Sequence, residues 1–525
     1  MTANTNPPST NPRQYLPVNP PAMRAWRAVC ALALLSLAIS APSLGNWCGW
    51  STDCFSFLTH ARTLAETGSF VESRVNTPPG YPVLLATLVR ISGELPILGL
   101  RWLSALALAA SAVGTYLIHR ERIGARWAWV AGLVVASSPV LLRLTTNPLS
   151  EPLFMAILCA LIILSQRWMA RGIQSPLEVI LGGLGLAALI LIRSMGIALL
   201  PCMIWAILKC PHRSRWSRAG CAASLSFVTM TPIIAWELRQ QQYPVTFGYQ
   251  QAWTHARDAE STTATGLPLQ AERLARFGLL RLESIKELFL PKTILWRAYQ
   301  PPLNQPTTWL IGGGVVFIGL TLAMHRQSPT DLYALLTLLM LALWPYDEGV
   351  RLVSPLLPIF IAYPFVAAQW IMRQLKQNPA ARWTITTILL GWISLHAWGT
   401  GDWWSRLPAY RAKQVALLDQ IEEMSAWQRD HLPKQECVAI LPEGDNSKLV
   451  LAGAAYLART TIRYVDCIPG RPLDIGTAPI TTALVHHSLS DSVRQITSLT
   501  PTGKIGPFTI LQRPMSTDIA HAKTE

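Results

Sequence analysis

Residues Trp50–Tyr81, WSTDCFSFLTHARTLAETGSFVESRVNTPPGY, separate the first long apolar run of the chain from those that follow. This segment carries an acid, Asp53, near its start and continues with helical spacing. It closes on the turn-forming sequence NTPPGY, residues 76–81. A polar segment held between apolar runs is where we expect a membrane enzyme to place its reactive groups.

The composition is typical of a polytopic membrane protein with some soluble mass. Of 525 residues, 51% are hydrophobic and only 14% are charged. The net charge of +15 could suggest a nucleic-acid partner, but the chain has no basic stripe and no known reader motif. Its basic residues stand in short segments between apolar runs, where they set topology and contact anionic lipids. We therefore expect membrane lipids as partners, and no nucleic acid.

The apolar runs predict eleven membrane spans, because roughly 20 mainly apolar residues cross a bilayer. They form a transmembrane domain at 23–400, with a Pro- and Asn-rich disordered tail at 1–22 before it. The expected spans cover residues 23–44, 98–118, 127–145, 150–168, 177–193, 195–208, 219–237, 307–325, 330–345, 352–371 and 383–399.

The distribution of Lys and Arg orients these spans. Basic residues near 24–27, 120–126, 167–171, 209–218 and 373–382 fall on one side if the N-terminus is cytoplasmic. The segment 81–91 is then a short interfacial helix, since its eleven residues are too few to cross. An odd number of spans places the C-terminus outside, together with two outer loops at 45–97 and 238–306.

From about residue 400 the composition becomes that of a soluble domain. We expect a small extracytoplasmic α/β domain at 401–515, followed by a disordered tail at 516–525. Helical spacing is expected at 417–431 and 448–459, and strands at 437–441, 462–465, 480–485 and 507–512.

The nine cysteines form no metal-binding pattern. Two pairs share an expected external region: Cys48 with Cys54, and Cys437 with Cys467. Each pair is either a disulfide, as an oxidising compartment favours, or two unpaired small hydrophobic residues.

Two acids are candidates for chemistry. Asp53 alone is most typical of a helix N-cap, and Glu151 of a residue that favours a helix dipole next to a capping Ser150. The expected topology nevertheless places both carboxylates on the outer face. A pair of carboxylates in one cavity suits acid–base work or the binding of a divalent cation, so a cation held by Asp53 and Glu151 stays open.

Two arginines are candidates for binding an anion. Arg351 precedes a Pro-rich span and is either a snorkelling residue paired with Asp347 or Glu348, or a phosphate ligand. Arg193 stands between two apolar runs on the outer face, against the charge bias. An arginine at membrane depth is a functional candidate. The chain has no P-loop, GxGxxG, HExxH or CxxC motif, which argues against nucleotide-driven chemistry.

These features together resemble the GT-C superfamily of polyprenyl-phosphate-dependent glycosyltransferases. The most similar branch is the bacterial group related to protein O-mannosyltransferases and to the aminoarabinose transferase of lipid A. The resemblance covers roughly residues 25–400. Four stretches carry it: Asp53 with its helix up to TPPGYP (77–82), SSPVLLRLTTNPLSE (137–151), ALILIRSMG (188–196) and DEGVRLVSPLLP (347–358).

The resemblance implies a role for each candidate residue. Asp53 would be the general base that takes a proton from the acceptor hydroxyl, and Glu151 would orient the acceptor, hold Asp53 or help to bind a metal. Arg351 would hold the phosphate of the leaving group, and Arg193 matches a basic residue of the family. The residues expected to join them in binding the substrate and its phosphate are Tyr81, Tyr346 and Glu348.

The implied activity is transfer of a sugar from a polyprenyl-phosphate donor to a glycan, lipid or protein acceptor. The implied place is the outer face of a bacterial inner membrane. Asn76-Thr77 stand where the aminoarabinose transferases have an acid and a basic residue, and Ser194 stands where the family has proline. The first departure argues against an aminoarabinose donor and a lipid A acceptor. Two alternatives remain: a transporter or flippase of a lipid-linked saccharide, and a non-enzymatic scaffold.

Overall fold

The computed structural model describes residues 22–442 and four later segments, 462–467, 482–486, 500–505 and 508–512. Within the first range, 46, 71–77, 94–95, 212–213, 242–277, 279–280, 283, 290–305, 326, 344–349, 376–377 and 432–436 are outside the description. Most of residues 1–22, most of the expected outer loop 238–306 and the tail 516–525 therefore lie outside the described residues.

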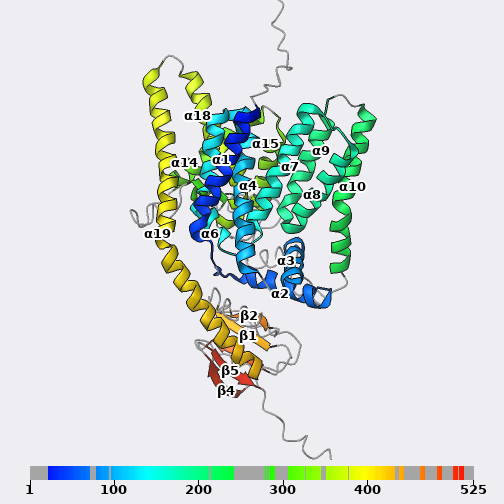
Figure 1. Ribbon diagram of the computed structural model, residues 1–525, viewed down its shortest axis with the longest axis vertical. Helices are drawn as coiled ribbons and strands as arrows, with labels where there is room; N and C mark the ends of the chain where they lie inside the picture. The colour runs from blue at the N-terminus through cyan, green and yellow to red at the C-terminus, as the bar shows by residue number, and fades with distance from the viewer. Residues whose placement is uncertain are drawn as a thin grey trace, which may run out of the picture.

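The described chain is mainly helical, and its helices pack side by side into a bundle (Figure 1). Short 3₁₀ segments, η1 (Ala41–Ser43), η2 (Ser194–Ala198) and η4 (Ser354–Leu356), join some of them. The helices are α1 (Ala22–Ser40), α2 (Thr52–Thr67), α3 (Gly80–Ser92), α4 (Ile97–Ile123), α5 (Ala125–Ala136), α6 (Pro139–Thr145), α7 (Glu151–Arg171), α8 (Pro176–Ile192), α9 (Leu199–Leu208), α10 (Arg215–Gln240), α14 (Pro306–Met324), α15 (Pro329–Leu343), α16 (Val350–Val353), α17 (Leu357–Phe360), α18 (Ala362–Gln374) and α19 (Pro379–His431).

Helix is present in each of the eleven ranges where the sequence predicts a span. Among the described residues, four helical segments are long and apolar enough to cross a membrane: Trp26–Ser43, α4, α7 and α10. Two bent pairs, α5 with α6 (49°) and α16–α17 with α18 (47°), raise the number to six. The remaining expected spans fall on shorter or less apolar helices, so the number eleven stays a prediction.

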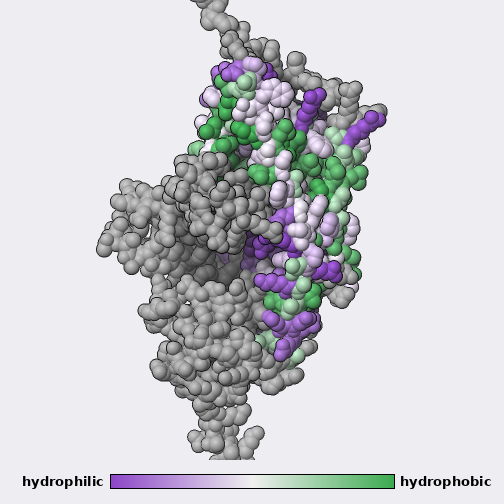
Figure 2. Space-filling model, turned by 90° about the vertical axis from the view of Figure 1, so that its left-hand side faces the viewer, coloured by the Kyte–Doolittle hydropathy of each residue, from purple (hydrophilic) through white to green (hydrophobic). Residues whose placement is uncertain are grey.

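The outer surface of the bundle carries exposed apolar side chains, as expected of a surface that faces lipid. Large apolar side chains are exposed on α10, such as Trp216 and Phe227, and on α19, such as Trp383 and Trp398. Figure 2 shows hydrophobic residues over the middle of one face, with hydrophilic residues above and below them. Inside the bundle small residues let helices approach closely: a Cβ atom on Gly132 of α5 would lie 2.7 Å from the carbonyl oxygen of Ala112 in α4.

Helices α2 and α3 lie together at the lower end of the bundle in Figure 1. Ser51 is the N-cap of α2, and its hydroxyl accepts a hydrogen bond from the backbone N–H of Cys54. The prediction that Asp53 caps this helix is therefore wrong, because Ser51 occupies that position and Asp53 lies in the first turn. The helix expected at 81–91 is present as α3, and its place at a membrane interface stays a prediction.

The C-terminal strands form one five-stranded sheet in the order β2-β1-β3-β5-β4. Strand β1 pairs in parallel with β2 and β3, whereas β5 pairs antiparallel with β3 and β4. Four strands lie where the sequence predicts them, and β4 is additional. The bounds are β1 (Cys437–Pro442), β2 (Ile462–Cys467), β3 (Thr482–His486), β4 (Thr500–Ile505) and β5 (Phe508–Gln512).

The sheet lies beyond the lower end of the bundle, at the opposite end from the start of α1 (Figure 1). Helix α19 connects the bundle to it. The helix expected at 448–459 lies outside the described residues, so the α/β character of this domain stays a prediction.

Neither proposed disulfide is supported. Cys48 and Cys54 are free and buried, as the alternative of small hydrophobic residues predicts. In the β1–β2 register Cys437 faces Ile462, and Cys467 faces Pro442. The two cysteines thus stand five positions apart along the strands, roughly 16 Å, which is too far for a disulfide.

Candidate active site

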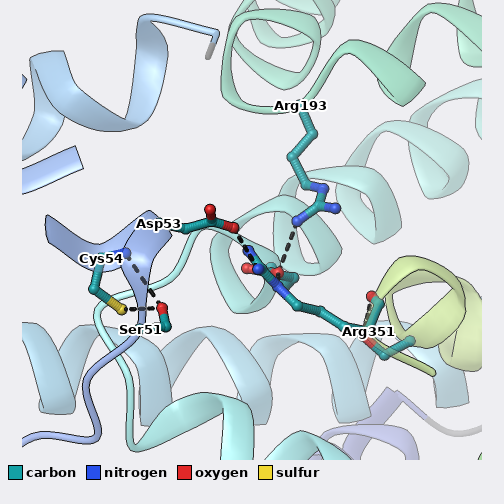
Figure 3. Close-up of polar contacts among 7 residues, drawn as sticks. Ser51, Asp53, Cys54, Arg193 and Arg351 are labelled. Carbon is teal, nitrogen blue, oxygen red and sulfur yellow. Dashed lines mark hydrogen bonds and ion pairs between the residues drawn. The ribbon is translucent and has the colours of Figure 1, made fainter. Parts of the chain in front are cut away.

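Four of the predicted residues meet at one place, although they come from distant parts of the chain (Figure 3). The guanidinium of Arg351 donates through Nη1 to Oδ2 of Asp53 and through Nε to Oε1 of Glu151. Arg193 Nη1 lies 2.8 Å from the same Glu151 oxygen. The result is a cluster of two carboxylates and two guanidiniums, called here the acid–arginine cluster.

Local sequence places each side chain at a helix end. Asp53 is in the first turn of α2, and Glu151 is the first residue of α7, so both carboxylates face helix N-termini, which favour negative charge. Arg193 ends α8 with an extended backbone before η2 begins. Arg351 lies in the short α16, and its carbonyl accepts a hydrogen bond from the Ser354 hydroxyl, 2.9 Å away.

The exposed fraction of the side chains in the acid–arginine cluster differs from one residue to the next. The side chain of Glu151 is 0% exposed, that of Arg193 14% and that of Arg351 26%. The side chain of Asp53 is 45% exposed. The two carboxylates and two guanidiniums cancel in formal charge, so the cluster as a whole is electrically balanced, and Asp53 is its more exposed carboxylate.

Only one of the two carboxylate oxygens of Glu151 contacts the arginines. Its Oε1 receives both arginines, whereas Oε2 is buried and has no hydrogen-bond partner among the described residues. A buried carboxylate oxygen without a donor is costly.

Tyr81 lies near the cluster but is not part of it. It is buried on α3 and packs edge-on against Phe57, with ring centroids 5.2 Å apart. Burial raises the pKa of its phenol well above the usual range, with a smaller contribution from the nearby Cys54 and Glu151. The phenol therefore stays neutral, and its role in binding stays a prediction. Tyr346 and Glu348 lie outside the described residues, as does Asp347, so their roles are also untested.

The arrangement does not suit a resident divalent cation. Within the described part of the chain no three His, Cys, Asp or Glu side chains gather as a metal site would require. In addition, both acids face guanidiniums, and two of these stand beside Glu151. Their positive charges oppose a cation at the position where Asp53 and Glu151 would have to bind it.

Sequence reasoning missed the residues that hold the two acid-bearing loops. The backbone N–H of Trp50 donates to Oε1 of Gln414 at 2.9 Å, across 364 positions of sequence. The backbone N–H of Gly49 donates to the carbonyl of Thr146 at 2.9 Å. No sequence signal marks these contacts, because a glycine and a glutamine carry no recognisable motif.

Part of the chain matches a known family. Residues 76–236 match the profile of the family described as dolichyl-phosphate-mannose-protein mannosyltransferase. The matched range includes Glu151 and Arg193 but neither Asp53 nor Arg351. The match covers a domain of this family and less than a third of the chain.

The solved structures show how far the GT-C fold extends. ArnT from Cupriavidus metallidurans bound to undecaprenyl phosphate has a TM-score of 0.55 at 13% identity, over 93% of this chain and 98% of ArnT. Its apo form has a TM-score of 0.53 at 11% identity, with the same coverage. The Archaeoglobus fulgidus oligosaccharyltransferase in complex with Zn and sulfate has a TM-score of 0.50 at 11% identity, over 88% of this chain and 68% of that protein. No curated protein sequence matches the chain.

The GT-C fold therefore spans nearly the whole chain, and the chain is a multi-pass membrane protein. At these identities the likeness establishes the fold alone.

Proposed function

We propose that the chain is an integral membrane glycosyltransferase that moves a sugar from a polyprenyl-phosphate donor to a hydroxyl acceptor. The observation that carries the proposal is the bridging of Asp53 and Glu151 by Arg351. A carboxylate open to substrate stands beside a guanidinium that can receive a phosphate. The family profile and the GT-C fold support this assignment, and one of the similar structures holds undecaprenyl phosphate.

Asp53 acts as general base in this proposal. It takes the proton of the acceptor hydroxyl as the hydroxyl oxygen attacks the anomeric carbon of the sugar. The bond between that carbon and the phosphate oxygen breaks, and the electron pair leaves with the phosphate. The proton stays on Asp53 until it passes to water.

Arg351 stabilises the leaving phosphate. In the described structure its guanidinium is shared by the two acids, so an incoming phosphate competes with Asp53 for it. A guanidinium binds phosphate through a planar fork, and it offsets the charge that develops as the bond breaks. Donor binding thus draws Arg351 away from Asp53 and frees the base only when a donor is present.

Glu151 holds the arginines in place during this exchange. Its burial and its contact with Arg193 keep one anion fixed beneath the site. No step involves a metal, because the charges around both acids do not fit one.

The cellular setting completes the proposal. Eleven spans cross a bacterial inner membrane, with the N-terminus in the cytoplasm, and the acid–arginine cluster and the C-terminal domain face the periplasm. The acceptor is a glycan, a lipid or a protein, and the donor is a hexose or pentose linked to polyprenyl phosphate.

Transfer by the purified protein tests the proposal. The protein in detergent is incubated with the total lipid extract of its source membranes as donor and an envelope fraction as acceptor. Mass spectrometry should detect acceptor-dependent release of polyprenyl phosphate, which Arg351→Ala abolishes and the exposed-site control Glu121→Gln leaves unchanged. A flippase would instead carry lipid-linked sugar across liposomes without releasing any polyprenyl phosphate, and that result would refute the assignment.

A further inference from the structure

Helix α19 runs from the bundle to the C-terminal sheet without a break. Its 53 residues, Pro379–His431, extend roughly 80 Å, more than twice the thickness of a bilayer core. The first strand of the sheet begins six positions later, at Cys437. The helix therefore extends well beyond the bundle, toward the sheet (Figure 1).

The middle of α19 contacts the two loops that lead to the acids. Trp403 donates from its indole nitrogen to the hydroxyl of Ser43, 3.4 Å away. Tyr410 packs edge-on against Trp47 with ring centroids 5.9 Å apart. One turn further, Oε1 of Gln414 accepts the backbone N–H of Trp50, three residues before Asp53.

The same region of α19 touches the second loop. The hydroxyl of Tyr410 lies 3.5 Å from Oδ1 of Asn147, four residues before Glu151. Asn147 Oδ1 also accepts the hydroxyl of Thr146 at 3.0 Å. The loop before Asp53 and the loop before Glu151 thus both contact the same stretch of α19.

Gly49 is the point where the two loops and the helix cross. Its backbone N–H donates to the carbonyl of Thr146, which ties one loop to the other. A Cβ atom here would overlap Oδ1 of Asn147 and lie 2.5 Å from the hydroxyl oxygen of Tyr410. Only glycine fits this crossing without displacing both partners.

We infer that Gln414 is a positioning residue for Asp53, through which α19 holds the loop that carries this acid of the acid–arginine cluster. The inference rests on the proposed transferase function. Gln414 is buried and contacts the loop rather than the substrate, so it acts through the backbone of Trp50. Its amide oxygen fixes the start of α2 and thereby the direction in which the Asp53 carboxylate points.

Three variants of the full-length protein test this inference. Gln414→Leu removes the acceptor for the Trp50 N–H, Gln414→Glu keeps an oxygen in the same place, and Gln420→Leu makes the same change at an exposed position of α19. Transfer is measured with the source-membrane lipid extract as donor. We expect Gln414→Leu to lower kcat about tenfold with little change in the apparent KM for the extract, and the other two variants to stay within about twofold of wild type.

Hydrogen exchange gives a readout independent of activity. Amides of residues 48–55 should exchange about tenfold faster in Gln414→Leu than in wild type, and at the wild-type rate in Gln414→Glu and Gln420→Leu. Unchanged exchange and unchanged kcat in Gln414→Leu would overturn the inference. If the wild type transfers no sugar but exchange rises as expected, the proposed function fails and the hold of Gln414 on this loop stands.

Discussion

Arg351 has two partners that lie 298 and 200 residues away in sequence. The expected topology placed Asp53 and Glu151 on one face, and the sequence offered Asp347 or Glu348, which lie outside the described residues, as one set of partners for the arginine. The partners that the structure shows come from remote segments, because α2 and α7 both begin where α16 lies. A charge pair between remote helix ends depends on packing that no local pattern encodes.

The two ion pairs that buried Glu151 makes with Arg193 and Arg351 should contribute strongly to the free energy of unfolding. Glu151→Gln leaves two guanidiniums without their shared anion, so we expect a loss of about 3 kcal/mol in the free energy of unfolding. Unfolding by SDS in mixed micelles measures this loss, and Glu121→Gln at an 84% exposed site should change it by less than about 0.5 kcal/mol.

A double-mutant cycle measures the interaction between Glu151 and Arg193 separately from their other contacts. Glu151→Gln combined with Arg193→Met should cost at least about 1 kcal/mol less than the sum of the single changes, since each single change already removes the pair. Additive effects would show that the two side chains do not interact in the folded protein.

The thiols of Cys48 and Cys54 should be unreactive toward alkylating agents in the folded protein. Burial raises the pKa of each thiol to about 12, so almost no thiolate exists near neutral pH. We expect alkylation by iodoacetamide at pH 8 to be on the order of a thousandfold slower than that of free cysteine. The SDS-unfolded protein, in which both thiols react, is the control. Rapid labelling before unfolding, or a disulfide-linked pair of peptides, would contradict the structure.

At the scale of elements, composition located the helices but not all their ends. The sequence predicts a span at 383–399 and a separate helix at 417–431, whereas α19 is one helix that passes through Pro408. The change from apolar to polar residues near 400 marks where the helix leaves the apolar layer, not where it ends. Good helix formers such as Ala, Leu, Gln and Glu continue it beyond that point.

The contact of α3 with α8 positions Arg193. A Cβ atom on Gly80 would lie 2.8 Å from the carbonyl carbon and oxygen of Leu191, two residues before Arg193. Gly80→Ala should therefore push the end of α8 away from the cluster and lower transfer at least tenfold. The control is Gly220→Ala in α10, where a methyl group meets open space and should not reduce activity. Full transfer by Gly80→Ala would show that this contact does not set the position of Arg193.

At the scale of the whole molecule, the sequence located the helices of the bundle and four of the five strands, because long apolar runs and short β-type runs are strong signals. It missed β4, whose sequence TPTGKI contains a proline and a glycine and lacks the alternation of a strand. The register shift between Pro501 and Gly503 lets these residues pair with β5. Pairing across the sheet, rather than local propensity, makes this segment a strand.

The two ends of the protein should face opposite sides of the membrane. The start of α1 and the sheet lie at opposite ends of the bundle (Figure 1), and the basic loops favour a cytoplasmic N-terminus. Protease added to spheroplasts should remove a C-terminal tag and spare an N-terminal one, with both digested after lysis. Protection of both tags, or digestion of both, before lysis would refute the odd number of spans.

The most direct test of the central claim is sugar transfer by Asp53→Asn. This change keeps the size of the side chain and removes its charge, so Arg351 keeps its contact with Glu151 and becomes more available to phosphate. We expect transfer to fall about a thousandfold, as loss of a general base does, while the protein elutes as a folded monodisperse species and binds undecaprenyl phosphate at least as tightly as wild type. Transfer at the wild-type rate by Asp53→Asn would contradict the assignment of this cluster as the active site.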